Sequence, residues 1–281
     1  MNRLELSTKP QKVSNSRLTT WLACKEQYAA KYLHDPRLPE TVHKKTTLGS
    51  VIHSILECLM DTSSVVEREV YAKYSIENGT LHPTMARLYR MLIRKYGISG
   101  DEDIRELGET LLLKTFCHGF CEHKKIIDIE RGFEIPVSPN VSITGFIDRV
   151  QEIDENTIEL EDYKSGRPYS PNDCESSTQP FFYLIAAKTL YPKHKNVIFT
   201  FHFLSNKKSY TISPKTQQEL KNFKGFIVSQ GMAMKVFDAS MKKPTRSWIC
   251  KFCSFKSPQL DYNYSGCSAF YDAEGQSIYG G

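Results

Sequence analysis

The hydrophobic pattern of this chain changes period near residue 130, and this change limits the fold more than any other feature of the sequence. Residues 62–127 read as several helices, with breaks at ENGTLHPT and GISGDED. Beyond them, three segments have the composition of strands and are separated by the turn signals SPN and DEN: GFEIPVS, VSITGFIDRVQEI and TIELEDYKSG. Helices followed by consecutive strands predict an α/β fold with a sheet at its centre.

The remaining segments complete this pattern. SNSRLTTWLACKEQYAAKYL and LGSVIHSILECLM each predict a helix before the strands. After the strands, residues 179–190 read as a helix, NVIFTFHFLS and KSYTIS as two strands, and residues 213–241 as a long helix. The order helix, βββαββ, helix predicts an α/β core with a helical insertion and excludes a doubly wound nucleotide-binding fold.

Composition bounds the class of protein. The 281 residues are 40% hydrophobic and 25% charged, as in ordinary soluble globular proteins. A net charge of +5 permits a polyanionic partner without requiring one. No run of 18 apolar residues predicts a transmembrane helix, and the polar residues 1–13, expected to be loose, lack the apolar core of a secretory signal. We therefore expect a cytoplasmic protein.

The strand TIELEDYKSG ends in an Asp-x-Lys pair. Because side chains two apart in a strand share a face, Asp162 and Lys164 lie side by side, and GFIDR brings Asp148 to the neighbouring strand. Two adjacent carboxylates repel unless a cation such as Mg²⁺ or Mn²⁺ binds them, and a nearby lysine can orient water and neutralise a phosphoryl group. The pattern indicates phosphodiester hydrolysis. For Asp-x-Lys alone, a solvated ion pair at a strand end is the simpler interpretation.

Four blocks in order, between Gly49 and Tyr183, carry a resemblance to a known family: LGSVIHSILE, GFIDR, EDYKSG and QPFFY. They are similar to the G-x-x-x-H, G-x-[IV]-D-R, D-Y-K-[ST]-G and Q-x-x-x-Y motifs of the PD-(D/E)XK nuclease superfamily. The similarity is to its RecB-like branch, with helicase-nuclease domains, small CRISPR-associated nucleases and phage exonucleases. It implies a restriction-endonuclease-like core, in which a central mixed β-sheet is flanked by helices.

The resemblance also implies one nuclease domain over residues 1–281. Its parts would be N-terminal helices with Cys24 and His53 (14–60), a helical insertion (61–130), the nuclease core (131–240) and a Cys-rich tail (241–281).

The same resemblance implies two sets of site residues. The metal ligands would be His53, Asp148, Asp162 and the backbone carbonyl of Tyr163, with the imidazole favouring Mn²⁺ over Mg²⁺. The catalytic lysine would be Lys164, positioned together with the DNA by the helical pair Gln179 and Tyr183. Taken alone, His53 reads as a partly buried helix residue, and Glu57 as either a solvated side chain or a second-metal group.

Basic residues offer contacts for DNA. Arg149 and Arg167 flank the acidic strands and either contact phosphate or form exposed surface charge. In the insertion, MARLYRMLIRKYG interleaves the basic residues Arg90 and Arg94 with Tyr89 and Tyr96, as a single-stranded substrate requires. An ordinary amphipathic helix with solvated arginines is the alternative.

Cysteines mark a further site. Eight cysteines without a secretory signal do not indicate a disulfide framework. In the related nucleases one N-terminal and three C-terminal cysteines hold a 4Fe-4S cluster, which here implies Cys24, Cys250, Cys253 and Cys267. Four thiolates also suit Zn²⁺, and unligated thiols with a fortuitous CxxC are the third interpretation. Cys117 and Cys121 are expected in a helix core.

Together these features predict a metal-dependent deoxyribonuclease, an exonuclease acting on free or single-stranded DNA ends in recombination, repair or replication. Its setting would be the cytoplasm of a bacterium or a phage-infected host, without membrane contact. A helicase, a recombinase or a second copy are possible partners. The alternative is a DNA-binding, nuclease-fold subunit or scaffold of a larger recombination or CRISPR-adaptation assembly.

Overall fold

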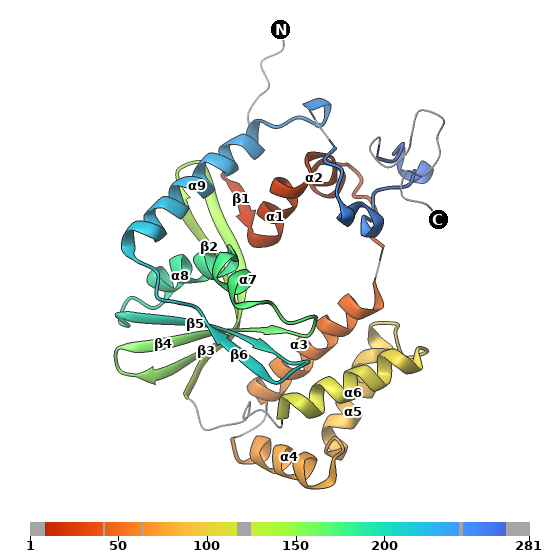
Figure 1. Ribbon diagram of the computed structural model, residues 1–281, viewed down its shortest axis with the longest axis vertical. Coiled ribbons are helices and arrows are strands. Elements are labelled where there is room, and N and C mark those ends of the chain that lie inside the picture. The colour runs from red at the N-terminus through yellow and green to blue at the C-terminus, as the bar shows by residue number, and fades with distance from the viewer. Residues whose placement is uncertain (1–8, 42, 63–64, 117–124, 242–243, 268–281) are drawn as a thin grey trace. The chain divides into compact units, whose positions relative to one another are not determined.

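In the computed structural model, residues 9–41, 43–62, 65–116, 125–241 and 244–267 are described. The chain divides into two compact units, each made of segments distant in the sequence (Figure 1). The first unit contains residues 1–41, 135–144 and 221–281, and the second contains residues 42–134 and 145–220. The single nuclease domain expected over residues 1–281 therefore stays a prediction.

The first unit begins with a strand, β1 (Gln11–Ser14), where we expected a loose segment. β1 runs parallel to Val141–Thr144, the start of β3 (Val141–Asp154). Val13 is fully buried. The expectation was wrong because QKVS has no strand pattern of its own, and its pairing with a distant segment makes it a strand.

The first predicted helix is divided into α1 (Asn15–Ala23) and α2 (Lys25–Tyr32), which meet at Cys24. The backbone of Cys24 is extended (φ −159°, ψ 119°), and its Sγ accepts the backbone N–H of Gln27 at 3.5 Å. The thiol therefore caps α2 at a break between two helices instead of lying on a helix face.

Aromatic side chains join α1 and α2 to α9 (Gln217–Val236). Trp21 makes edge contacts with Tyr28 and Phe237, with ring centroids 4.9 and 5.0 Å away, and donates Nε1–H to Gln230 at 2.9 Å. The helix predicted over residues 213–241 is shorter, because α9 ends at Val236 and a separate 3₁₀ turn follows at Ala239–Met241. The Cys-rich tail contains two further 3₁₀ turns, at Trp248–Phe252 and Leu260–Tyr262. A small apolar cluster connects this tail to the N-terminal region: Ala30, Leu38, Phe255 and Tyr264.

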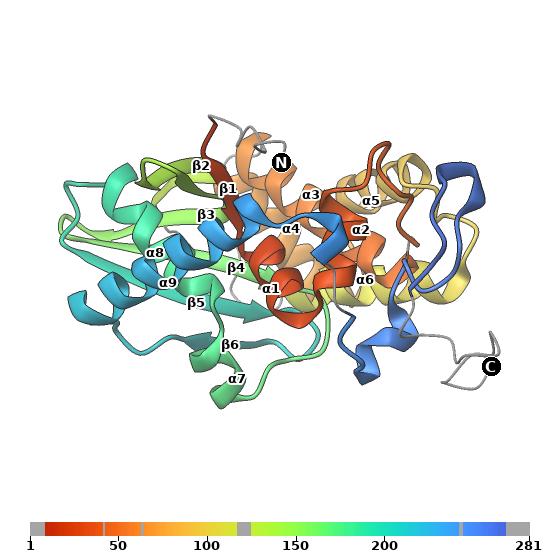
Figure 2. The ribbon, with the colours of Figure 1, turned by 90° about the horizontal axis from the view of Figure 1, so that it is seen from above.

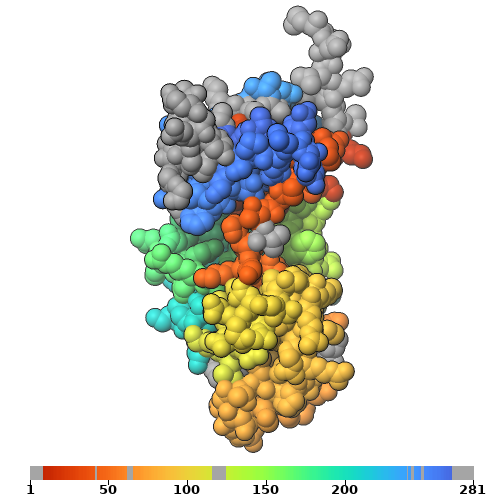
Figure 3. All heavy atoms as spheres, turned by 90° about the vertical axis from the view of Figure 1, so that its right-hand side faces the viewer, coloured from red at the N-terminus to blue at the C-terminus, as the bar shows by residue number. Residues whose placement is uncertain are grey.

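The second unit contains the predicted helical insertion. Its helices are α3 (Lys44–Thr62), α4 (Val65–Asn78), α5 (Pro83–Lys95) and α6 (Glu102–Phe116). The last three form the orange and yellow surface in Figure 3. Buried side chains of α3, α5 and α6 share one core, which includes Ile52, Ile55, Met85, Tyr89 and Leu112. The insertion ends earlier than residue 130, because a strand already begins at Lys125.

The strands form one mixed sheet. They are β2 (Lys125–Ser138), β3, β4 (Thr157–Lys164), β5 (Asn196–Phe203) and β6 (Lys208–Thr211), in addition to β1. The order is β1-β3-β4-β5-β6, and β2 pairs with β3. β3 and β4 are antiparallel, β4 and β5 parallel, and β5 and β6 antiparallel. The predicted α/β class with a central mixed sheet flanked by helices is confirmed.

The two faces of β4 and β5 differ in polarity. Ile158, Leu160, Phe199 and Phe201 are buried on one face, where α8 (Gln179–Leu190) packs against β5 (Figures 1 and 2). A short helix, α7 (Pro171–Ser176), precedes α8. Asp162 and Lys164 continue the apolar face at the end of β4.

Among the described helices, none has the length and apolar character needed to span a membrane.

Candidate active site

Helix α3 brings two motif residues to the end of β4. A Cβ on Gly49 would lie 2.8 Å from Ser165 Oγ, so glycine lets α3 approach the loop that follows β4. His53 lies one turn later on the same helix face, and its Nε2 is 2.9 Å from the backbone oxygen of Tyr163. The G-x-x-x-H pattern therefore corresponds to a close contact between a helix and a strand end.

The carboxylates come from adjacent strands. Arg149 pairs with Glu161 across β3 and β4, and this register brings Asp148 beside Asp162. Asp148 accepts the backbone N–H of Tyr163 at 2.8 Å. Burial, together with the charge of Asp162, raises the pKa of Asp148 well above its ordinary value. The two carboxylates thus repel each other in a buried position.

The imidazole of His53 faces these carboxylates. A carbonyl oxygen only accepts, so Nε2 donates its hydrogen to Tyr163. Burial lowers the pKa of His53, although Asp162 opposes this, and the neutral ring is favoured. Nδ1 then presents a lone pair 3.4 Å from Asp148 Oδ2 and 4.0 Å from Glu130 Oε1. Three electron-rich groups converging in this way need a cation or protons among them.

Glu130 is a site residue that sequence reasoning missed. It lies within β2, but its φ of 44° is in the left-handed region, which is rare for residues other than glycine. Burial, with the charges of Glu57 and Asp162, raises the pKa of Glu130 to about 7. No local sequence pattern marks this glutamate as a site residue, because its positive φ arises only in the folded chain.

These side chains form a group able to hold a metal. The ligand atoms of His53, Glu130 and Asp148 lie within 4.8 Å of one another, the one such group found in the described part of the chain. Two carboxylates, an imidazole and a nearby carbonyl are a donor set suited to Mg²⁺ or Mn²⁺. The residues present therefore fit a hard divalent cation.

Lys164 lies beside this group. Its Nζ forms an ion pair with Asp162 at 2.6 Å and donates to Gln179 Oε1 at 2.9 Å. Burial by itself would lower the pKa of Lys164, but the charge and hydrogen bond of Asp162 outweigh it and raise the pKa. Gln179 in turn donates Nε2–H to Asp162 at 2.6 Å and to the Tyr183 hydroxyl at 2.9 Å. The start of α8 thus orients both the lysine and the carboxylate.

A groove of about 800 Å³ opens beside these residues. One part of its lining comes from α3 and the residue after α5, and the other from Glu130 of β2, the end of β4 and the following loop. The lining residues that can meet a substrate include Lys45, His53, Glu57, Tyr96, Glu130, Lys164, Arg167 and Tyr169. The groove therefore gathers cationic, aromatic and metal-ligating side chains.

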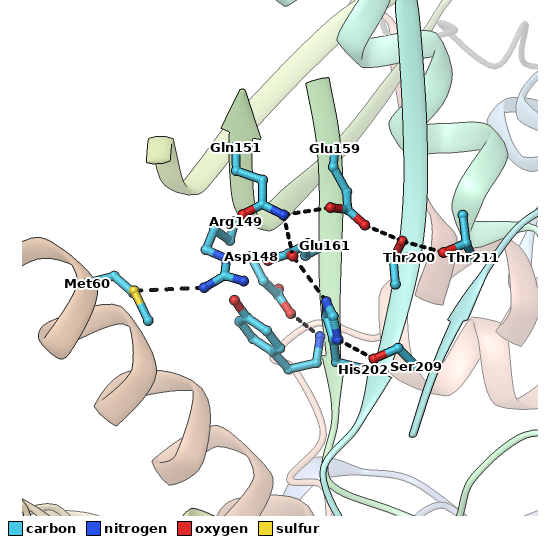
Figure 4. A network of polar contacts seen from close by, with 11 residues as sticks. Met60, Asp148, Arg149, Gln151, Glu159, Glu161, Thr200, His202, Ser209 and Thr211 are labelled. Atoms are coloured by element: carbon cyan, nitrogen blue, oxygen red, sulfur yellow. Dashed lines mark hydrogen bonds and ion pairs between the residues drawn. The ribbon is translucent and has the colours of Figure 1, made fainter. Parts of the chain in front are cut away.

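Arg149 does not contribute to this groove. Only 4% of its surface is exposed, and its guanidinium pairs with the fully buried Glu161 (Figure 4). Burial would raise the pKa of Glu161, but Arg149 and His202 outweigh it and lower the pKa to about 2. The phosphate contact predicted for Arg149 is wrong, because a buried ion pair across two strands engages the guanidinium.

That ion pair belongs to a buried polar network on the second face of the sheet. Gln151 donates to Glu159 and Glu161 at 2.6 and 2.8 Å, and Thr200 donates to Glu159 at 2.5 Å (Figure 4). The network supports the end of β4, where Tyr163 and its carbonyl lie.

The arginines of α5 are exposed, but not on the groove. Arg90 and Arg94 are solvent-exposed and are absent from the groove lining. Tyr89 is buried and donates its hydroxyl to the backbone oxygen of Arg105 at 2.9 Å. Its ring is therefore unavailable to a base, contrary to our expectation, whereas Tyr96 lines the groove.

The four cysteines expected to act together line one small cavity of about 30 Å³ in the first unit: Cys24, Cys250, Cys253 and Cys267. Backbone N–H groups of Gln27 and Thr245 point to Cys24 Sγ, both at 3.5 Å, and that of Ser247 points to Cys250 Sγ at 3.4 Å. Cys117 and Cys121 lie outside the described residues.

Comparison with known proteins agrees with this site. A family model described as the PD-(D/E)XK nuclease superfamily matches residues 12–257. Curated relatives include ATP-dependent helicase/deoxyribonuclease subunits of Streptococcus pyogenes, from serotypes M12 and M1. Both are 24% identical over 200 residues, which are 68% of this chain and 18% of the relative. The chain thus spans less than a fifth of those relatives.

A solved structure, that of SSO0001, is 15% identical and covers 74% of this chain and 92% of its own, with a TM-score of 0.27.

Proposed function

Because the chain belongs to the PD-(D/E)XK nuclease superfamily, we propose that it is a metal-dependent DNA exonuclease acting in recombination, repair or replication. The observation that carries the proposal is the convergence of Lys164, paired with Asp162, and the group of His53, Glu130 and Asp148 beside one groove. A structural ion pair at a strand end would need neither the imidazole nor the third carboxylate.

The proposed reaction is hydrolysis of a phosphodiester. The oxygen of a water forms a bond to phosphorus and an ester P–O bond breaks, while the proton that the water loses is balanced by the proton that the leaving oxygen gains. A bound divalent cation supplies an acidified water and neutralises phosphate charge. Lys164 stays protonated through Asp162 and can stabilise negative charge on the phosphoryl oxygens. Gln179 orients both groups, and Tyr183 orients Gln179.

The ligands that we propose are His53, Asp148, Asp162 and the Tyr163 carbonyl, with Glu130 as an additional carboxylate. Arg167, on the groove lining, is proposed to contact phosphate. For Arg90 and Arg94, exposed on α5, DNA contact remains a proposal without support from the groove. The cytoplasm of a bacterium or an infected host, where thiols stay reduced, is the proposed location.

Digestion of end-labelled DNA tests the proposal. Single- and double-stranded oligonucleotides labelled at the 5′ or the 3′ end are incubated with Mn²⁺, Mg²⁺ or EDTA. We expect metal-dependent cleavage that Asp162→Asn and Lys164→Ala abolish and that Asp154→Asn, an exposed aspartate at the end of β3, leaves unchanged. The two labels give the polarity. Absence of cleavage with every metal would contradict the proposal.

We also propose that the four cysteines bind a 4Fe-4S cluster. Their common cavity and the N–H groups directed at sulfur support a ligated site. Thiolates around zinc lie about 3.8 Å apart, as follows from Zn–S bonds of about 2.3 Å in a tetrahedron. Among the described residues, no three cysteine sulfurs lie within 4.8 Å of one another. The iron and zinc content of the purified chain distinguishes a cluster from zinc.

A second candidate function follows from the relatives, which are described as subunits of a helicase/deoxyribonuclease. This chain could act as a DNA-binding subunit or scaffold beside a helicase or recombinase. Lys164→Ala distinguishes the two functions, because a scaffold keeps its biological activity in that variant and a nuclease loses it.

A further inference from the structure

Two aromatic side chains on the groove have no part in the hydrolytic chemistry. Tyr169 is 43% exposed and Tyr96 is 38% exposed, and both line the groove that His53 and Lys164 also line. Exposed aromatic rings beside cationic groups are the surfaces on which proteins stack the bases of a single strand.

Tyr169 is fixed against the sheet. Its ring makes edge contacts with Phe201 and Phe203, with centroids 5.8 and 5.5 Å away, and both phenylalanines are buried. The Nζ of Lys164 is 5.5 Å from the same Phe201 ring. Tyr169 and the lysine therefore have one neighbour in common and line the same groove.

Tyr96 comes from a different wall of the groove. It follows directly after α5, and its hydroxyl shares a hydrogen bond of 3.2 Å with Ser54 Oγ on α3. Both rings are thus anchored at one edge and open at the other, which limits the entropy lost when a base stacks on them.

Two cations complete the surface. Lys45, at the start of α3, and Arg167, in the loop after β4, line the same groove. Cations for successive phosphates combined with rings for bases match the chemistry of an unpaired strand. Inside a duplex both faces of each base are covered by its neighbours, so these tyrosines can stack on internal bases only when the strand is unpaired.

We propose that Tyr169, together with Tyr96, stacks nucleobases next to the cleaved phosphate and makes unpaired DNA the substrate. This inference rests on the nuclease function proposed above.

The test compares normal with abasic DNA. Cleavage rates are measured on a single strand, on the same strand with abasic nucleotides around the cleaved linkage, and on a blunt duplex. Tyr169→Ala should lower kcat/KM on the normal strand about 5- to 150-fold, since stacking of one base contributes about 1–3 kcal/mol. On the abasic strand, it should change the rate less than about twofold.

Matched variants separate stacking from structure. Tyr169→Phe keeps the ring and should retain the rate within about twofold. Tyr169→Leu keeps apolar contact with Phe201 and Phe203 and should lose as much as alanine. Tyr96→Ala should behave like Tyr169→Ala, with a loss confined to the normal strand. Phe226→Ala removes an aromatic side chain of equal exposure (38%) on α9, outside the groove lining, and should have no effect.

Three results would overturn the inference: equal losses on normal and abasic strands, full activity of Tyr169→Leu, or a wild-type preference for blunt duplex. Binding of the labelled normal and abasic strands in EDTA, where no cleavage occurs, gives a second readout. If no metal supports cleavage but Tyr169→Ala still weakens binding of the normal strand alone, the nuclease proposal fails and the stacking surface stands. If the chain cleaves DNA and the rate does not depend on Tyr169, the stacking surface fails and the nuclease proposal stands.

Discussion

Gln179 contacts three polar groups of the candidate site with one amide. It accepts from Lys164 and donates to Asp162 and to Tyr183. Gln179→Leu should lower kcat about 10- to 100-fold, because the lysine and carboxylate lose the group that orients them. KM and DNA binding in EDTA should change little. Tyr183→Phe removes only the hydroxyl that accepts a hydrogen bond from Gln179, so it should lower kcat less than tenfold.

Steady-state kinetics on one labelled strand measure both variants. A full rate for Gln179→Leu, with folding verified by circular dichroism, would show that the amide has no part in positioning.

Glu130 makes stability depend on pH. Its pKa in the folded chain, about 7, exceeds the ordinary value of 4.5, so the folded state binds the proton more tightly. The resulting stability is fully present below pH 4.5 and is lost as the pH rises through about 7. Without metal, the Tm of wild type should therefore be lower than that of Glu130→Gln at pH 8 and equal to it at pH 5. Each kcal/mol of lost stability lowers Tm by about 2–4 °C.

Thermal melts in EDTA at the two pH values measure this difference. Added Mn²⁺ should stabilise wild type more than the glutamine variant at pH 8, since the carboxylate can then bind the cation. Glu155→Gln, in the exposed turn between β3 and β4, is the control. Equal pH dependence of wild type and Glu130→Gln would contradict the prediction.

The strand period placed Asp162 and Lys164 on one face and Asp148 on the neighbouring strand, whereas the role of Gln179 came from the resemblance to the nuclease motifs. Glu130 was missed because a positive φ within a strand has no local sequence signal. The exposure of Tyr96 and the burial of Tyr89, two tyrosines of one segment, likewise depend on which helix face meets the core.

Two helical glycines illustrate how neighbouring elements decide the effect of one substitution. A Cβ on Gly108 of α6 would lie 2.1 Å from the Tyr89 hydroxyl oxygen, whereas a Cβ on Gly225 of α9 has nothing within 4 Å. Gly108→Ala should reduce the free energy of unfolding by about 1–3 kcal/mol through overpacking. Gly225→Ala should increase it by about 0.5–1 kcal/mol through helix propensity.

Urea unfolding followed by circular dichroism measures both changes. The two substitutions are chemically identical. If both changed the free energy of unfolding in the same direction, the close approach of α6 to Tyr89 would not be what decides the effect at Gly108.

Strand pairing explains both a successful and a failed expectation. The strands of residues 132–166 were predicted from alternation and turns, and they are confirmed as β2, β3 and β4. The phosphate contact predicted for Arg149 was wrong, because the register of β3 on β4 places Arg149 opposite Glu161. A shift of one residue would have sent the guanidinium to the other face.

The cysteine cavity links the ends of the chain in the first unit. A cluster bound there would close a loop of more than 200 residues between Cys24 and Cys250, which constrains the unfolded chain. Cys250→Ser should lose bound iron and lower Tm by about 5–15 °C. Cys58→Ser, a cysteine of α3 outside this cavity, should keep the iron.

Iron and sulfide content, visible absorbance and thermal melts of the purified chain test this prediction. Stoichiometric zinc without iron would instead assign the cavity to zinc, and wild-type protein without either metal would contradict a ligated site.

The amino-acid pattern predicted the α/β class and, from residue 132 onward, every strand and the helices α8 and α9 but not α7, because hydrophobic periodicity acts over a few residues. The resemblance to short nuclease motifs supplied the expected site residues. Long-range contacts decided the rest. The pairing of β1 with β3, the division of the first helix at Cys24, the burial of Arg149 and the position of Glu130 each depend on segments far apart in the chain. Pairing, burial and backbone conformation at such points are set by the partner segment, and a residue's local sequence does not contain that partner.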